Sequence, residues 1–187
     1  SNDLSLNVSR EMLQQDPAIT SMRSALTKRV LDMLSRLADK EPEKYASFWE
    51  QFGGTLKEGL GEDNGNREKI ASLLRYRTTR SDDESRSFDN YLEDMKPEQD
   101  QIYYLVAESP SAAASSPHLE AFRDRDIEVL LLADRIDEWS LQFLTEYKGK
   151  ALRDISRGEL ELPQSDDEPE VSAEPDKNQL DLIERLK

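Results

Sequence analysis

The segment EVLLLADRIDEW, residues 128–139, contains the clearest fold signal in this chain. Its first half, residues 128–133, is nearly all apolar, which is typical of a parallel strand that is covered on both faces. Its second half starts at Asp134 and is rich in acidic residues, which favour a helix start because the helix dipole attracts negative charge there. Residues 136–144 are expected to form that helix. A buried strand that leads directly into a helix indicates a layered α/β arrangement.

The neighbouring segments extend this pattern on both sides. Residues 101–107, QIYYLVA, form another apolar run with strand composition, and residues 151–155 are expected to be a third strand. Pro117 is well placed as the first residue of an intervening helix, and residues 147–150 predict a turn. A charged stretch, residues 79–87, is expected to be a loop. The predicted fold class is therefore mixed α/β, with a small α/β/α layered subdomain.

The first half of the chain is predicted to be helical. Pro17 opens a helix of about six turns, in which apolar residues recur every three or four positions and predict one buried stripe. The stripe consists of Ile19, Met22, Leu26, Val30, Met33 and Leu37. Residues 41–75 add an aromatic stripe that ends at Gly53 and Gly54, and glycines are expected to divide this region into three short helices. These short helices would form a helical connector ahead of the α/β subdomain.

Composition excludes several classes of function. The chain of 187 residues has a net charge of −15, which opposes general nucleic-acid binding and docking on anionic membranes, because both need an excess of lysine and arginine. It contains no cysteine, so no disulfide and no thiolate metal site can form. No apolar run approaches the roughly 20 residues of a membrane-spanning helix. Residues 159–187 contain ten acidic and three basic residues and predict an acidic linker.

Few residues offer catalytic chemistry. His118 is the single histidine, and its place after Pro117 favours a surface or capping role over a nucleophile system. Asp134, Asp137 and Glu138 follow a strand, where α/β sheets place ligands, and three carboxylates there could hold magnesium for a hydrolase. The alternative interpretation is structural, with Asp134 capping a helix and the other two acids stabilising its first turn.

Arg10 is a candidate anion-binding residue. It stands between a short apolar segment and a helix start, with Gln14 one turn later on the same face. The planar guanidinium group suits phosphate oxygens. From spacing alone, a surface ion pair is the alternative interpretation.

Several segments resemble the signature sequences of the heat-shock-protein-90 chaperones. They are LNVSREMLQQ at residues 6–15, IYY at 102–104 followed by SSPHLEAF at 115–122, and IEVLLLADRIDEW at 127–139. Their order and spacing are also similar to those of the family, and the resemblance extends over residues 3–160. The short loops and the lone histidine are most similar to the bacterial, HtpG-like branch.

The resemblance implies a middle-domain fragment of a longer, ATP-driven chaperone. The ATP-binding domain and nearly all of the dimerisation domain would then be missing. The implied boundaries are residues 3–40 for the end of the large middle subdomain, 41–80 for the helical connector, 81–158 for the small α/β subdomain, and 159–187 for the acidic linker and the start of the C-terminal dimerisation domain.

The resemblance also implies roles for individual residues. In the family, residues that match Arg10 and Gln14 belong to a catalytic loop that reaches the γ-phosphate of ATP, which the missing N-terminal domain holds with magnesium. The fragment alone is therefore expected to be no enzyme and to hold no cofactor. Glu138, Trp139 and Gln142 match part of a client-binding surface. For Trp139, a core position is the alternative interpretation, because this residue follows a buried strand.

The expected partners follow from the same resemblance. They are client proteins, the protein's own N-terminal ATPase domain and co-chaperones such as the DnaK system. The intact protein would be a cytoplasmic homodimer of the stress response, and the fragment a monomer. Two alternatives stay open: a magnesium-dependent hydrolase that uses Asp134, Asp137 and Glu138, and a passive scaffold segment with no site of its own.

Overall fold

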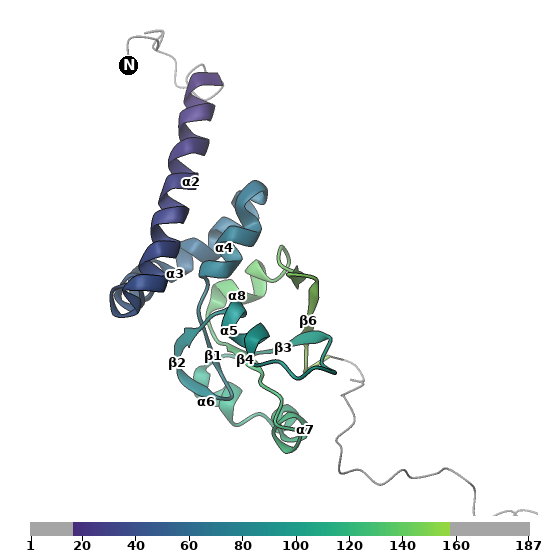
Figure 1. Cartoon of the computed structure of the whole chain (residues 1–187). Helices are drawn as coiled ribbons and strands as arrows, with labels where there is room; N and C mark the ends of the chain where they lie inside the picture. Colours follow the sequence, from purple (N-terminus) through teal and green to yellow (C-terminus); the bar gives the residue numbers. More distant parts are fainter. Residues whose placement is uncertain (1–16, 158–187) are drawn as a thin grey trace, which may run out of the picture.

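The computed structural model of the protein describes residues 17–157. Two long helices come first, and a sheet with short helices on both faces follows them (Figure 1). The helices are α2 (Pro17–Lys40), α3 (Pro42–Glu62), η1 (Asn64–Asn66), α4 (Arg67–Leu73), α5 (Phe88–Glu93), α6 (Pro110–Ala114), η2 (Pro117–Leu119), α7 (Glu120–Asp124) and α8 (Arg135–Ser140). The strands are β1 (Tyr76–Thr78), β2 (Ser81–Arg86), β3 (Gln101–Val106), β4 (Leu130–Leu132), β5 (Glu146–Tyr147) and β6 (Lys150–Asp154).

The six strands form one sheet in the order β2-β1-β4-β3-β6-β5. Strand β3 pairs in parallel with both β4 and β6, whereas β1 pairs with β4 antiparallel. The three predicted strands are confirmed, although the one predicted over residues 128–133 is shorter and covers only 130–132. The predicted turn over residues 147–150 is also confirmed, and Gly149 has a φ of 79° there, which favours glycine. The pairing of β3 and β4 agrees with the all-apolar character of β4.

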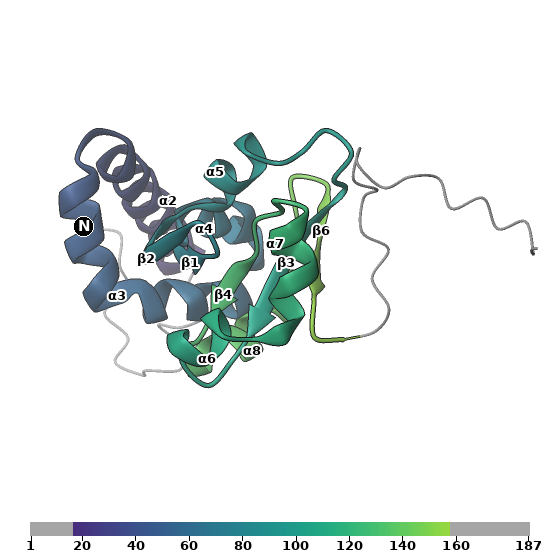
Figure 2. The same ribbon diagram turned by 90° about the horizontal axis from the view of Figure 1, so that it is seen from below.

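Both faces of the sheet are covered. Leu130 and Leu132 point into one core, which the residues of α3, α4 and α5 complete, and Leu131 points into a second core below α6, η2 and α7. Seen from below, α6 and α7 lie in front of β3 and β4 (Figure 2). The predicted layered architecture is therefore confirmed, and it explains why β4 is buried at every position.

The predicted loop over residues 79–87 is wrong. Residues 81–86 form β2, which pairs with β1 in a hairpin with Thr78 opposite Ser81. Strand β2 lies at an edge of the sheet and its side chains are exposed or half-buried. A charged composition suits such an edge because it prevents further strand pairing. The absence of apolar residues therefore hid a strand that has only one neighbour.

The predicted break at Gly53 and Gly54 is also wrong. Helix α3 runs without interruption through both glycines for 21 residues, so the connector is not a set of three short helices. A Cβ atom on Gly53 would lie only 2.9 Å from the ring of Trp49. At this position glycine serves close packing inside the helix and does not end it.

Helix α2 forms as predicted, but most of its predicted buried stripe is wrong, and only Leu37 of the stripe packs against the core. The exposed fractions of Met22, Leu26, Val30 and Met33 lie between 46% and 64%, and the buried residues are Leu31 and Leu34 on a neighbouring face. Within the residues that the structure describes, α2 packs mainly on α3 and α4, and its first half projects away from the body (Figure 1). The spacing of apolar residues predicted the helix correctly, but it did not predict which face of the helix the neighbouring elements cover. In the same described part of the chain, no helix is both long and apolar enough to cross a membrane.

Alkaline pH should destabilise this fold through its buried phenols. Tyr45 is buried, its hydroxyl donates to the carbonyl oxygen of Leu73, and burial raises its pKa to about 12 although Arg75 lowers it. The unfolded phenol ionises near pH 10 while the folded phenol stays neutral. The free energy of unfolding should therefore fall between pH 10 and 12, by up to about 1.4 kcal/mol per pH unit for this group.

Urea unfolding followed by circular dichroism between pH 8 and 12 measures this loss. Tyr45→Phe should show a shallower decline in that window, because it removes one titrating phenol while the other buried tyrosines remain. The slopes are compared and not the absolute values, since the lost hydrogen bond itself lowers stability by about 1 kcal/mol at every pH. An equal slope in the variant would contradict the assignment.

Candidate functional site

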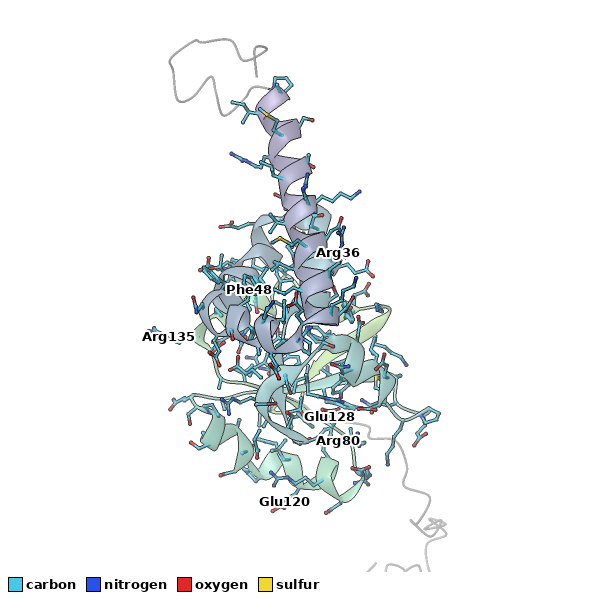
Figure 3. The ribbon with its side chains drawn as sticks, turned by 60° about the vertical axis from the view of Figure 1, so that its left-hand side comes forward. Arg36, Phe48, Arg80, Glu120, Glu128 and Arg135 are labelled. Carbon is cyan, nitrogen blue, oxygen red and sulfur yellow. The ribbon has the colours of Figure 1, made fainter. Side chains whose placement is uncertain are left out.

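Helix α8 follows β4 directly and carries most of the predicted site residues. Asp134 is its N-cap, and the backbone N–H of Asp134 donates to Oδ2 of Asp137 at 3.0 Å. Glu138 lies in the same first turn and is exposed. Arg135, the first residue of the helix, points away from the body (Figure 3). The interpretation of Asp134, Asp137 and Glu138 as residues of a helix start is confirmed.

A buried lysine from α3 binds two of these carboxylates. Nζ of Lys57 lies 2.5 Å from Oδ2 of Asp134 and 2.7 Å from Oδ1 of Asp137. Only 1% of Lys57 is exposed, and Asp137 is equally buried. We call these three residues the lysine cluster. It joins the middle of α3 to the first turn of α8, two elements about 80 residues apart in the sequence.

Lys57 and Asp137 are removed from water, whereas the side chain of Asp134 is half exposed. Burial opposes the charge of Lys57, but Asp137 and Asp134 together outweigh this effect and raise the pKa of Lys57. Burial raises the pKa of Asp137, and Lys57 only partly offsets that increase. The ammonium group also lies 5.1 Å from the ring centroid of Tyr76 and 5.6 Å from that of Trp49, where the aromatic faces attract a cation.

The position of Lys57 opposes the magnesium interpretation. A metal ion between Asp134 and Asp137 would have to displace a buried ammonium group that already lies between them. Glu138 is exposed and is not part of the lysine cluster. Among residues 17–157, no three or more acidic or histidine side chains are arranged to hold a metal ion. The hydrolase alternative therefore has no support in this geometry.

Sequence reasoning missed Lys57, although one signal was present. The buried face of α3 consists of Tyr45, Trp49, Gly53, Lys57 and Leu60. These positions are three or four residues apart, which is the spacing of one helix face. A lysine in phase with an aromatic stripe is thus placed toward the interior, where a paired carboxylate must compensate its charge.

Trp139 lies at the surface, which is one of the two positions that the sequence left open. Its exposed fraction is 36%, and its ring packs against Phe143 with the two centroids 4.7 Å apart. We call Trp139 and Phe143 the aromatic pair. Gln142 follows in the turn after α8, is exposed, and its backbone N–H donates to the carbonyl oxygen of Trp139 at 3.2 Å. Glu138, Trp139 and Gln142 therefore all reach the surface.

The aromatic pair packs on a glycine of α3. A Cβ atom on Gly61 would lie 2.6 Å from the ring of Trp139 and 2.9 Å from the ring of Phe143. Real Cβ atoms do not approach neighbouring atoms this closely, so the two rings pack directly against the backbone of α3. Sequence reasoning took Gly61 only as the end of a helical turn and missed this contact.

The remaining candidates lie elsewhere. His118 is exposed in η2, and its backbone N–H donates to Oγ of Ser116, as a surface or capping role predicts. Arg10 and Gln14 lie outside the residues that the structure describes. Their predicted contact with a phosphate stays a prediction.

Comparisons with known proteins point to one family. The family model described as Hsp90 protein matches residues 1–187. The structure is also similar to the middle domain of a heat shock protein from Plasmodium falciparum, with 32% sequence identity and a TM-score of 0.71. That match covers 75% of this chain and 58% of the other chain, so this chain spans little more than half the length of the structure that it matches.

The lysine cluster should be a major source of stability. Lys57→Met should lower the free energy of unfolding by about 3–5 kcal/mol, because it leaves the buried carboxylate of Asp137 without its counter-charge. Lys44→Met is the matched control: Lys44 also lies on α3 and pairs with Glu41, but this pair is exposed and should contribute less than about 1 kcal/mol.

Urea unfolding of both variants at neutral pH measures the difference. In a Lys57→Met background, Asp137→Leu should recover part of the loss, since it removes the unpaired charge. Equal effects at Lys57 and Lys44 would show that the lysine cluster contributes no more than a surface pair.

Proposed function

The chain belongs to the Hsp90 protein family, and from this premise we propose that it forms the later part of the middle domain of an ATP-dependent molecular chaperone. The observation that carries the proposal is the family match along the whole chain, supported by the likeness of its fold to a middle domain. The intact protein would act on partly folded client proteins. We assign it to the bacterial, HtpG-like branch on the sequence resemblance alone.

In this proposal Arg10 acts on ATP that another domain binds. An arginine stabilises the negative charge that develops on a transferring phosphoryl group, and we assign a supporting role to Gln14, four residues later in the sequence. The segment at residues 6–15 supports the assignment by its resemblance to the family's catalytic loop. ATP and magnesium would be held by the N-terminal domain, so this chain by itself would not hydrolyse ATP.

The second proposed site is a client-binding surface at α8. Its support is the partial exposure of Trp139 beside the exposed polar residues Glu138 and Gln142. A large aromatic side chain that is half in contact with the protein gives a partner considerable area at low entropic cost. Phe143 extends the apolar part, and the guanidinium carbon of Arg67 lies 5.9 Å from its ring centroid. Such a mixed surface suits partly folded chains, which present apolar and charged groups together.

The remaining assignments complete the proposal. The partners are clients, the N-terminal ATPase domain and co-chaperones such as the DnaK system. The intact protein is proposed to be a cytoplasmic homodimer, and this chain alone a monomer. A passive scaffold is the competing function, and it predicts that neither of the following substitutions changes activity or binding.

Arg10→Ala, made in the intact protein, should lower ATP turnover by about 100-fold or more, because one strong charge-stabilising group is lost. ATP binding should survive, since the nucleotide is held elsewhere. Steady-state turnover and nucleotide affinity measure the two effects separately. Arg36→Ala is the control, because Arg36 is exposed on α2 (Figure 3); equal turnover in the two variants would refute the role of Arg10.

Trp139→Arg should weaken binding to a partly folded protein by about tenfold, the effect of losing an aromatic anchor. Far-UV circular dichroism should stay native, because only part of the side chain is buried. His118→Arg adds the same charge at an exposed position on the helices of the opposite face of the sheet and should leave binding unchanged. Loss of the fold in Trp139→Arg would instead assign this residue to the core.

A further inference from the structure

Helix α3 touches α8 at two points one helical turn apart. Lys57 binds the first turn of α8 through Asp134 and Asp137, and Gly61 lies under the aromatic pair. Positions 57 and 61 share one face of α3 because residues four apart lie above one another on a helix. We propose that Lys57 and Gly61 are positioning residues that set how far Trp139 and Phe143 are presented to a client. This inference rests on the proposed client-binding surface at α8.

The contact at Gly61 makes the position of the aromatic pair depend directly on the position of α3. A methyl group there would overlap both rings of the aromatic pair. The rings therefore rest on the backbone of α3, and a small shift of α3 has no soft side chain to absorb it. Packed interiors respond to such shifts by discrete rearrangement and not by gradual compression. The location of α3 thus determines where the rings lie.

The contact at Lys57 fixes the start of α8. The ammonium group binds two carboxylates from the N-terminal turn of α8, at 2.5 and 2.7 Å. Since Lys57 and Asp137 are buried, separating their charges without water is strongly unfavourable, whereas the side chain of Asp134 is half exposed. Helix α8 is therefore attached to α3 at its start and supported by it at Trp139, so that it follows the movement of α3.

The aromatic pair has space into which it can move. Phe143 borders a cavity of about 520 Å³ that is also lined by Arg67, Tyr147 and Lys148. The cavity lies between the start of α4 and the turn that joins β5 to β6. Space next to the ring of Phe143 is therefore open to a shift of this side chain when the contact at Gly61 changes.

Gly61→Ala and Gly54→Ala form a matched test. Both glycines lie in α3, and both substitutions gain the same helix propensity, but a Cβ atom on Gly54 meets open space. The two tryptophans give two indole N–H signals in an ¹⁵N NMR spectrum, and Trp139→Phe identifies the signal of Trp139. Gly61→Ala should shift this signal and raise its accessibility to a soluble paramagnetic probe, whereas Gly54→Ala should leave it unchanged.

Binding to a partly folded protein gives the second measurement. Gly61→Ala should change Kd by about threefold or more, and Gly54→Ala should not change it. A shifted Trp139 signal without any effect of Trp139→Arg on binding supports the positioning role and removes the client-binding proposal. An unshifted Trp139 signal in folded Gly61→Ala overturns the positioning role, whatever Trp139→Arg does.

A second pair of variants covers the case that Gly61→Ala does not fold. Lys57→Arg keeps the charge but lengthens the link to α8, and it should move the Trp139 signal in the same experiment. Lys44→Arg makes the same change at the exposed pair on α3 and should not move it. Identical Trp139 signals in these two variants would overturn the role of Lys57.

Discussion

The buried ammonium group of Lys57 is the constraint on which the arrangement of the helical part and the α/β part depends. A charge removed from water is tolerated only where counter-charges and hydrogen bonds compensate it, and here the compensation comes from α8. Helix α3 must therefore lie against the end of β4, where Asp134 and Asp137 project. The sheet presents these carboxylates because β4 ends directly before them. The helical part and the α/β part consequently share one core, in which Tyr76 and Trp49 border the same lysine.

Gly61 on α3 makes this close approach possible, because it leaves room for Trp139 and Phe143. Gly53 leaves room for the ring of Trp49 within the same helix. Both glycines weaken the helix by about 1 kcal/mol each relative to alanine, because glycine loses more conformational freedom. Packing against large rings offsets that loss. Gly54 has no such neighbour, so its presence has no explanation in the contacts of the described residues.

The sequence predicted the parts of the fold that are buried on regular patterns. β3, β4 and β6 and the start of α2 followed from apolar runs and from proline. The start of α8 followed from its acidic first turn, but the helix ends at Ser140 and residues 141–144, predicted to continue it, are not helical. β2 was missed because an exposed edge strand needs no apolar residues, and the stripe of α2 was misjudged because periodicity does not reveal which face has neighbours. Lys57 and Gly61 were missed for a related reason. A lysine is most often a surface charge and a glycine most often ends a helix, so only the tertiary contacts reveal that Lys57 is a buried ion-pair partner and that Gly61 is a packing site for two rings. For Glu138, Trp139 and Gln142, resemblance supplied the candidates and the structure supplied their exposure.

A continuous series of packed elements leads from α2 to the proposed client-binding surface at α8. Arg10 precedes α2 in the sequence, α2 packs on α3, and α3 contacts α8 at Lys57 and Gly61. Continuity alone does not establish coupling, which requires an element with two discrete arrangements whose balance both sites affect. The aromatic pair is the element where a shift of α3 would act, because its rings contact the backbone at Gly61 and Phe143 borders a cavity. Such a shift would reach the proposed client-binding surface through the contacts of α3 with α8 at Lys57 and Gly61.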